Sequence, residues 1–403
     1  MFLGLGAFAQ EPLSYSRFME MVSQKNALYL AEKYNVDIAV ANAQAAAVFN
    51  DPELSVEYGN NQDWSIQMGQ SLDVGLGYTF SLGNVRGARM QVAGTELAIS
   101  EQAVADYFCG LKAEAAQAYA EAWACSRMAD LMEESYNNMD RIARSDSLRL
   151  STGDLSMTDA MQSRLEARAM HNDYLAARNE YANSLVALST FIGGDRVLSV
   201  SQSLTALAAV PADSPVGVLV DMAKENRSDL RAAELGKRLS ADNLRLVQAS
   251  RAMEIGLGLG YSYNTEVRNE IAPAPLFHGL SFGVTIPLKF SSINRGEKVA
   301  AQRAVDQSNK AYEAAVQQIE AEVIQAYNSW QTAGEILGSY DSSILTDAAM
   351  VLENRTIGYR SGNSGLLELL AAQAAYNEIM SAYIDACKNA FIASAMLNRS
   401  LGL

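Results

Sequence analysis

The chain has 403 residues, a formal net charge of −15 and only two histidines, His171 and His278. The acidic balance argues against nucleic acid and against an anionic membrane surface as partners. Three widely spaced cysteines give neither a disulfide framework nor a metal-binding pair. The sequence also contains no apolar run of about 18 residues, which is the length that would predict a helical membrane span. No pairing of a nucleophile with a base is evident either, so we expect no enzymatic activity, no cofactor and no resident metal.

The amino terminus carries an A-x-A pattern, Ala7-Phe8-Ala9, behind a short apolar stretch. This pattern is typical of the cleavage site of a secretory signal, although the basic residues that usually precede it are missing. We interpret residues 1–9 as the remnant of a signal peptide.

A helical pattern then runs from Leu13 to about Asn50. It stops at Asp51-Pro52, because proline disfavours the helical conformation in the residue before it. Alternation of period 2 predicts two strands after this stop, at about 53–59 and 66–82.

The second of these strands has the clearest alternation in the chain. Its apolar face comprises Ile66, Met68, Leu72, Val74, Leu76, Tyr78, Phe80 and Leu82, and its other face is small and polar. Two such faces over about 17 residues are typical of an outer-membrane barrel strand. Because a membrane crossing needs only about 9–11 residues, we expect the strand to continue below the membrane.

A long helix without proline is predicted next, from about 86 to 150. A turn at Gly153-Asp154 and a return helix at about 157–191 follow it. Residues 10–194 thus form a first structural repeat. Residues 195–214, with Pro211 inside the segment and Pro215 directly after it, form a linker or equatorial segment.

The second half, residues 215–403, repeats this order. Its predicted elements are strands at about 254–263 and 277–289, a long helix at about 295–359 and a return helix at about 366–398. Gly153 matches Gly362, and the offsets between the halves stay between 206 and 209 residues. A nearly constant offset indicates one duplication rather than a solenoid.

The predicted helix 295–359 carries two apolar rows at seven-residue spacing, one from Val305 to Tyr340 and one from Val316 to Val351. These rows predict a continuous coiled-coil-like rod. At 1.5 Å per residue the rod would extend roughly 95 Å, which is too long for a compact domain. We therefore expect it to lie against other long helices.

Four membrane strands per chain are too few to close a barrel. Roughly eight strands are the minimum, and lipid offers no hydrogen-bond partners to an open sheet edge. Two copies would give a barrel of about eight strands without a useful bore, and three copies would give about twelve. We therefore expect an oligomer and favour three or more chains.

The duplicated unit, the passage from strand into long helix and the turn motifs resemble the TolC-like outer-membrane factors of Gram-negative bacteria, from Pro12 onward. The resemblance implies a mainly α-helical protein with a membrane β-barrel portion, in which a trimeric twelve-stranded barrel continues into a periplasmic α-helical tunnel. It also implies an outer-membrane location with contact to lipid. The implied partners are a periplasmic adaptor protein and an inner-membrane pump of the RND type.

The same resemblance assigns residues at the tip of the tunnel. It implies a pore aperture at Glu368 and Asp159 and a gate latch at Tyr359 and Asp159. The turns expected to contact the adaptor hold Gly153, Asp154, Gly362, Asn363 and Gly365. Ala371 stands where the family often has a second acid, and Ser364 replaces a basic latch residue. The simpler interpretation of Glu368 and Asp159 is that each stabilises the first turn of a helix through its dipole.

Aromatic residues at or near the ends of the predicted strands are candidates for girdles at the membrane interfaces. They are Tyr58, Tyr78, Phe80, Tyr261, Tyr263 and Phe277.

Three functions stay open at this point. The first is a passive outer-membrane exit duct of a tripartite efflux pump that carries small molecules or metal ions; the segment from Asn50 to Ser55 is similar to the branch of the family that serves heavy-metal pumps. The second is the outer-membrane channel of a type I protein secretion machine. The third is a coiled-coil scaffold without a pore.

Overall fold

The computed structural model describes residues 12–60, 68–204, 215–288 and 293–403. The predicted signal peptide and the second half of the predicted linker lie outside the described residues. The chain divides into two compact units, which we describe separately. The helical unit takes its described residues from Met1–Lys33, Val104–Ser228 and Val316–Leu403, and the strand unit comprises Tyr34–Ala103 and Asp229–Ala315.

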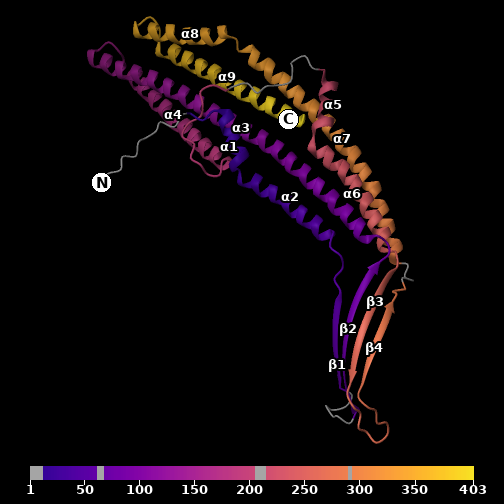
Figure 1. Ribbon diagram of the computed structural model, residues 1–403. Helices are drawn as coiled ribbons and strands as arrows, with labels where there is room; N and C mark the ends of the chain where they lie inside the picture. Colours follow the sequence, from indigo (N-terminus) through magenta and orange to yellow (C-terminus); the bar gives the residue numbers. More distant parts are fainter. Residues whose placement is uncertain (1–11, 61–67, 205–214, 289–292) are drawn as a thin grey trace. The chain divides into compact units, whose positions relative to one another are not determined.

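The strand unit contains one antiparallel sheet whose four strands lie side by side in the order β1-β2-β3-β4 (Figure 1). The strands are β1 (Glu53–Asn60), β2 (Gln70–Ser81), β3 (Glu254–Asn264) and β4 (Phe277–Thr285). β4 ends two residues before Pro287, which has no N–H group to donate to a sheet. β4 is therefore shorter than the expected 277–289. β2 is also shorter than the expected 66–82, of which residues 66 and 67 lie outside the described part.

The register of the sheet places residues of the same kind opposite one another. One row across all four strands consists of Val56, Val74, Tyr261 and Leu280, and the next consists of Leu54, Leu76, Leu259 and Phe282. Because directly opposed residues share a face, these rows form one continuous apolar surface. The other face carries small residues, for example the row Ser55, Gly75, Gly260 and Ser281. The alternation expected of β2 thus extends to the whole sheet.

The helices of the chain are α1 (Tyr15–Lys25), α2 (Ala27–Ala46), α3 (Val85–Thr152), α4 (Met157–Phe191), α5 (Val216–Asn226), α6 (Ser228–Ser250), α7 (Ile293–Ser339), α8 (Ser342–Arg360) and α9 (Leu366–Ser400). None of these helices is both long enough and apolar enough to cross a membrane.

Two helices predicted to be continuous are interrupted by side-chain caps. The rod expected over 295–359 breaks between α7 and α8, where the Asp341 carboxylate accepts a hydrogen bond of 3.0 Å from the N–H of Ile344. A hydrogen bond from the Ser343 hydroxyl, followed by that N–H, lowers the pKa of Asp341. The amino-terminal helix breaks similarly at Asn26, whose Oδ1 accepts from the N–H of Tyr29. Local capping therefore competes with an apolar pattern that would continue the helix.

The core of the helical unit joins α1, α3 and α4 around the buried side chains of Phe18, Tyr119 and Leu188. The described part of the predicted linker belongs to this core region. The N–H of Leu13 donates to the carbonyl of Ser199 at 2.9 Å, and the Trp123 indole donates to a carbonyl of the same segment at 3.0 Å. Residues 195–204 are therefore anchored to the helices.

Candidate functional site at the helical turns

The two turns that join α3 to α4 and α8 to α9 have the same backbone geometry. Gly153 and Gly362 follow the last residues of their helices with φ of 84° and 77°, a left-handed conformation that glycine adopts without steric cost. At each turn the glycine N–H bonds three residues back and the next N–H bonds five residues back, as in a Schellman motif. The predicted turn residues Gly153, Asp154, Gly362 and Asn363 therefore occupy matching positions.

Asp159 lies in the first turn of α4 and is engaged by the helix cap. The Ser156 hydroxyl accepts from the N–H of Asp159 at 3.1 Å and donates to its carboxylate at 2.8 Å. Asp154, in the preceding turn, accepts from the hydroxyl of Thr152 at 2.7 Å. This geometry stabilises the start of α4, which agrees with the simpler interpretation of Asp159.

Glu368 lies in the first turn of α9 and forms an ion pair with Arg355 of α8. Both side chains are about half exposed, at 54% and 50%. The Ser364 hydroxyl donates to the carbonyl of Arg355 at 3.4 Å, and Gly365 caps α9 without a side-chain hydrogen bond. The acid proposed for the aperture is therefore paired with a cation within the same chain.

Tyr359 of α8 contacts Asp146 of α3. The phenol donates to Oδ2 of Asp146 at 2.8 Å, and Asp146 is only 1% exposed. Its Oδ1 has no hydrogen-bond partner among the described residues, while the guanidinium of Arg149 lies 3.8 Å from it. Sequence reasoning singled out Tyr359 but missed Asp146. No spacing within α3 pointed to Asp146, because its partner lies 213 positions away on another helix.

Burial raises the pKa of Tyr359 above its ordinary value, and the hydrogen bond and charge of Asp146 raise it further. Asp159 also raises this pKa, whereas Arg149 opposes the shift. The phenol therefore stays protonated and acts as a donor over the physiological pH range. The hydrogen bond is surrounded by an apolar cluster from α3, α4, α8 and α9: Met139, Ile142, Ala143, Ala167, Leu352, Leu366, Leu369 and Ala372.

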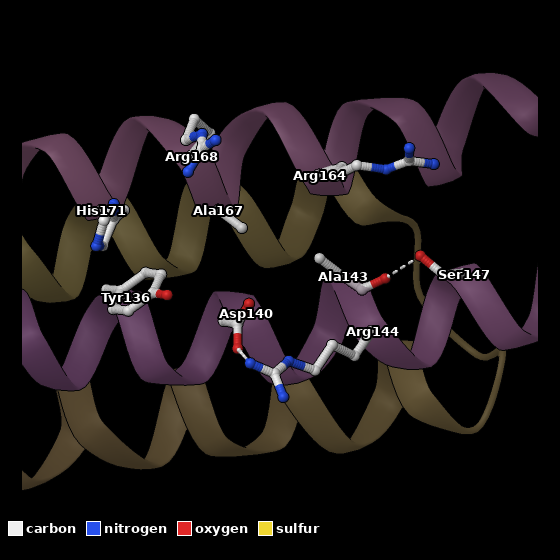
Figure 2. A pocket seen from close by; sticks show the side chains of 9 residues that line it. All are labelled: Tyr136, Asp140, Ala143, Arg144, Ser147, Arg164, Ala167, Arg168 and His171. Atoms are coloured by element: carbon white, nitrogen blue, oxygen red, sulfur yellow. Dashed lines mark hydrogen bonds and ion pairs between the residues drawn. The ribbon is translucent and has the colours of Figure 1, made fainter.

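A groove of about 270 Å³ lies between α3 and α4 (Figure 2). The rings of Tyr136 and His171 face one another across it, with centroids 4.6 Å apart. Asp140 pairs with Arg144 at 2.7 Å, while Arg164 and Arg168 have no ion pair among the described residues. The groove thus carries a net positive charge and can accept carboxylate or phosphate groups.

Four of the six candidate girdle residues lie near the ends of the apolar face. Tyr58 and Tyr263 lie in one row with Leu72, toward the end of the sheet where β1 connects to β2 and β3 connects to β4. Tyr78 and Phe80 lie near the opposite end of β2. Tyr261 instead lies in the row of Val74, within the face. Phe277 is the first residue of β4 and is opposite Asn264, so it lies at a strand end but on the small, polar face.

No group of three or more His, Cys, Asp or Glu side chains in the described ranges is arranged to hold a metal ion.

Comparisons with known proteins give one consistent result. The family "Outer membrane efflux protein" matches residues 219–403. The cobalt-zinc-cadmium resistance protein CzcC of Cupriavidus metallidurans is 21% identical over 397 residues, which cover 98% of this chain and 91% of CzcC.

Solved structures extend the similarity of fold over nearly the whole chain. A membrane protein from Pseudomonas aeruginosa has a TM-score of 0.79 at 20% identity, covering 96% of this chain and 92% of its own. CusC, whose structures concern transmembrane channel formation, has a TM-score of 0.75 at 19% identity, covering 96% and 91%. The fold is therefore that of outer-membrane efflux channels, with a helical portion and a β portion.

Proposed function

Since residues 219–403 match the outer membrane efflux protein family, we propose that the chain is such a protein and that three copies form a passive exit duct of a tripartite efflux pump. Proteins of this family are outer-membrane channels that extend into the periplasm, and this is the location of the chain. They are efflux channels and not enzymes. The proposal therefore concerns assembly, gating, cargo and partners.

The apolar face and the two edges of the sheet support the proposal that three copies assemble into one barrel. The apolar face extends across four strands, and among the residues that the structure describes β1 and β4 each pair on one side only. Lipid cannot satisfy the N–H and C=O groups of such edges, whereas β1 of one copy can pair with β4 of the next. Three copies would close a barrel of about twelve strands, wide enough for a water-filled bore.

We place the gate at the tips of the two helical hairpins. Tyr359 and Asp146 latch α8 to α3 within each chain, and Asp159 adds negative charge nearby. Glu368 of three copies forms the ring at the aperture, with Arg355 beside each carboxylate. The adaptor contact lies at Gly153, Asp154, Gly362, Asn363 and Gly365 and extends into the cationic groove of α3 and α4, which suits acidic side chains of a partner. An inner-membrane pump of the RND type completes the assembly.

Metal ions are the cargo that we favour, because CzcC is described as a cobalt-zinc-cadmium resistance protein and is similar to this chain along 98% of its length. Expression of this chain in a bacterium that lacks its own metal efflux duct should restore growth in cobalt, zinc or cadmium salts when a compatible pump and adaptor are present. A duct that restores export of a secreted protein but not metal tolerance would contradict this assignment and support the secretion alternative.

The aperture can be tested with two substitutions of opposite sign. Glu368→Gln removes a carboxylate and leaves Arg355 unpaired, so the cation selectivity of the channel should decrease. Arg355→Gln leaves the carboxylate unpaired, so cation selectivity and block by divalent ions should increase. Single-channel recording in planar bilayers, with divalent ions added to either side, measures both effects.

Trimer yield is the control for these two variants, because an exposed ion pair contributes only about 0–1 kcal/mol. Unchanged selectivity in both variants would remove Glu368 from the aperture and leave it as an acid of the first helical turn. Asp154→Asn, at the exposed turn, should change conductance less than Glu368→Gln does, and it should change adaptor binding more than Glu368→Gln does.

A further inference from the structure

A second cavity, of about 290 Å³, lies in the strand unit where β2 ends and α3 begins. β1 begins at Glu53, opposite Gly77, so residues 78–81 of β2 have no partner on the β1 side. The segment that follows α2 contributes Val48 and Phe49 to this region, and the first turns of α3 contribute Arg86 and Arg89. The described residues that line the cavity include no acid.

The two arginines differ in how they are held. Arg86 donates from Nε to the carbonyl of Ala47 at 2.6 Å, and its guanidinium lies 4.1 Å from the centre of the Phe49 ring. Arg89 is exposed and forms no ion pair or hydrogen bond among the described residues. Because the two residues are three apart on a helix, they lie on the same side of α3. The cavity therefore has one fixed cation and one that is available to a ligand.

The other wall of the cavity is aromatic and continues into the apolar face. The rings of Tyr78 and Phe80 are 4.6 Å apart in an edge arrangement. Phe49 and Phe80 are 66% and 47% exposed and line the cavity together with Tyr78. A contiguous exposed apolar surface of this kind marks a contact with a ligand or a membrane. Tyr78 belongs to the same face of β2 as Leu76 and Val74. An apolar chain can thus follow this face away from the arginines.

We propose that this cavity binds the phosphate headgroup of a phospholipid, with the phosphate at Arg86 and Arg89 and an acyl chain along Tyr78 and Phe80. The inference rests on the proposed function, in which the apolar face contacts lipid. Guanidinium groups bind phosphate through paired hydrogen bonds, and aromatic and basic side chains together mark the depth of a membrane interface. The bound lipid sets the depth of the sheet at the end where the helices begin.

The test uses the purified full chain in mild detergent with three probes: dioleoylphosphatidylglycerol, dioleoylglycerol and inorganic phosphate. Native mass spectrometry counts the probe molecules retained per chain. We expect retention of phosphatidylglycerol but not of dioleoylglycerol, which has the same acyl chains without the phosphate. Inorganic phosphate at the same concentration should not displace the lipid, because it lacks the apolar contacts.

Arg89→Gln should weaken retention of phosphatidylglycerol about five-fold or more, which is the effect of losing roughly 1 kcal/mol. Arg89→Lys should restore part of it, because the charge returns without the paired hydrogen bonds. Arg303→Gln is the matched control, since this arginine is 80% exposed on α7 and lies outside the cavity. Arg86→Gln is less informative alone, because Arg86 also holds the carbonyl of Ala47.

Equal retention in the wild type, Arg89→Gln and the double variant Arg86→Gln/Arg89→Gln would overturn the lipid site. Retention of dioleoylglycerol equal to that of phosphatidylglycerol would also overturn it, as would complete displacement by inorganic phosphate. Channel conductance of the same samples separates this result from the proposed function. If the wild type forms conducting channels but lipid retention is the same with and without the Arg89 side chain, the lipid site alone is rejected. If the wild type forms no conducting channels, the proposed duct is rejected.

Discussion

Leu259→Arg is expected to prevent assembly in the outer membrane, whereas Gly258→Arg, one residue earlier, still assembles and alters the pore. Leu259 is 61% exposed on the apolar face, between Leu76 and Phe282. An arginine that faces lipid near mid-bilayer costs roughly 2–4 kcal/mol in each copy. Gly258 lies on the small face, where the nearest atom to an added Cβ is a carbonyl oxygen at 4.0 Å. Heat-modifiable gel migration of the outer-membrane fraction measures assembly, and single-channel conductance measures the bore.

Leu72→Arg and Ser71→Arg repeat this comparison on β2, and the same difference is expected. Assembly defects of equal size on both faces would show that the apolar face does not contact lipid. Normal assembly of both Leu72→Arg and Leu259→Arg would contradict the proposed barrel as a whole.

Tyr359→Phe is expected to favour the open state of the channel. The substitution keeps the ring in the apolar cluster and removes the hydroxyl that donates to Asp146. A buried carboxylate that loses its donor costs about 1–3 kcal/mol, so the proposed latch between α3 and α8 loses stability. Open probability in planar bilayers should rise, and the unfolding temperature of the helical portion should fall.

The matched control is Tyr312→Phe on α7. The hydroxyl of Tyr312 has no hydrogen bond among the described residues, and its ring, 4.5 Å from the Lys237 ammonium, is retained in phenylalanine. An open probability that rises equally in both variants, or in neither, would contradict a latch at Asp146.

The pH dependence of the latch follows from the raised pKa of Tyr359. A group whose pKa is higher in the folded state stabilises the fold fully below its ordinary pKa, here 10.0, and this contribution is lost as the pH rises through the folded value. The latch is therefore expected to be insensitive to pH between 6 and 9. A steep change of open probability in that range would require another titrating group.

The sequence by itself determined the features that depend on local periodicity and turn chemistry. Alternation of period 2 predicted an apolar face on β2, and glycines at 153 and 362 predicted the turns between the helices. The order of elements in both halves, together with the turn motifs, indicated a resemblance to TolC-like outer-membrane factors, which the comparisons confirm. These features were accessible because each depends on residues that are neighbours in the chain.

Only the tertiary structure decided which distant residues meet. Asp146 and Tyr359 are 213 positions apart, and no spacing within either helix indicated their hydrogen bond. The pairing of Glu368 with Arg355 likewise depends on how α8 turns back into α9. Periodicity shows which face of an element is apolar, whereas the approach of two elements decides which of their polar side chains become partners.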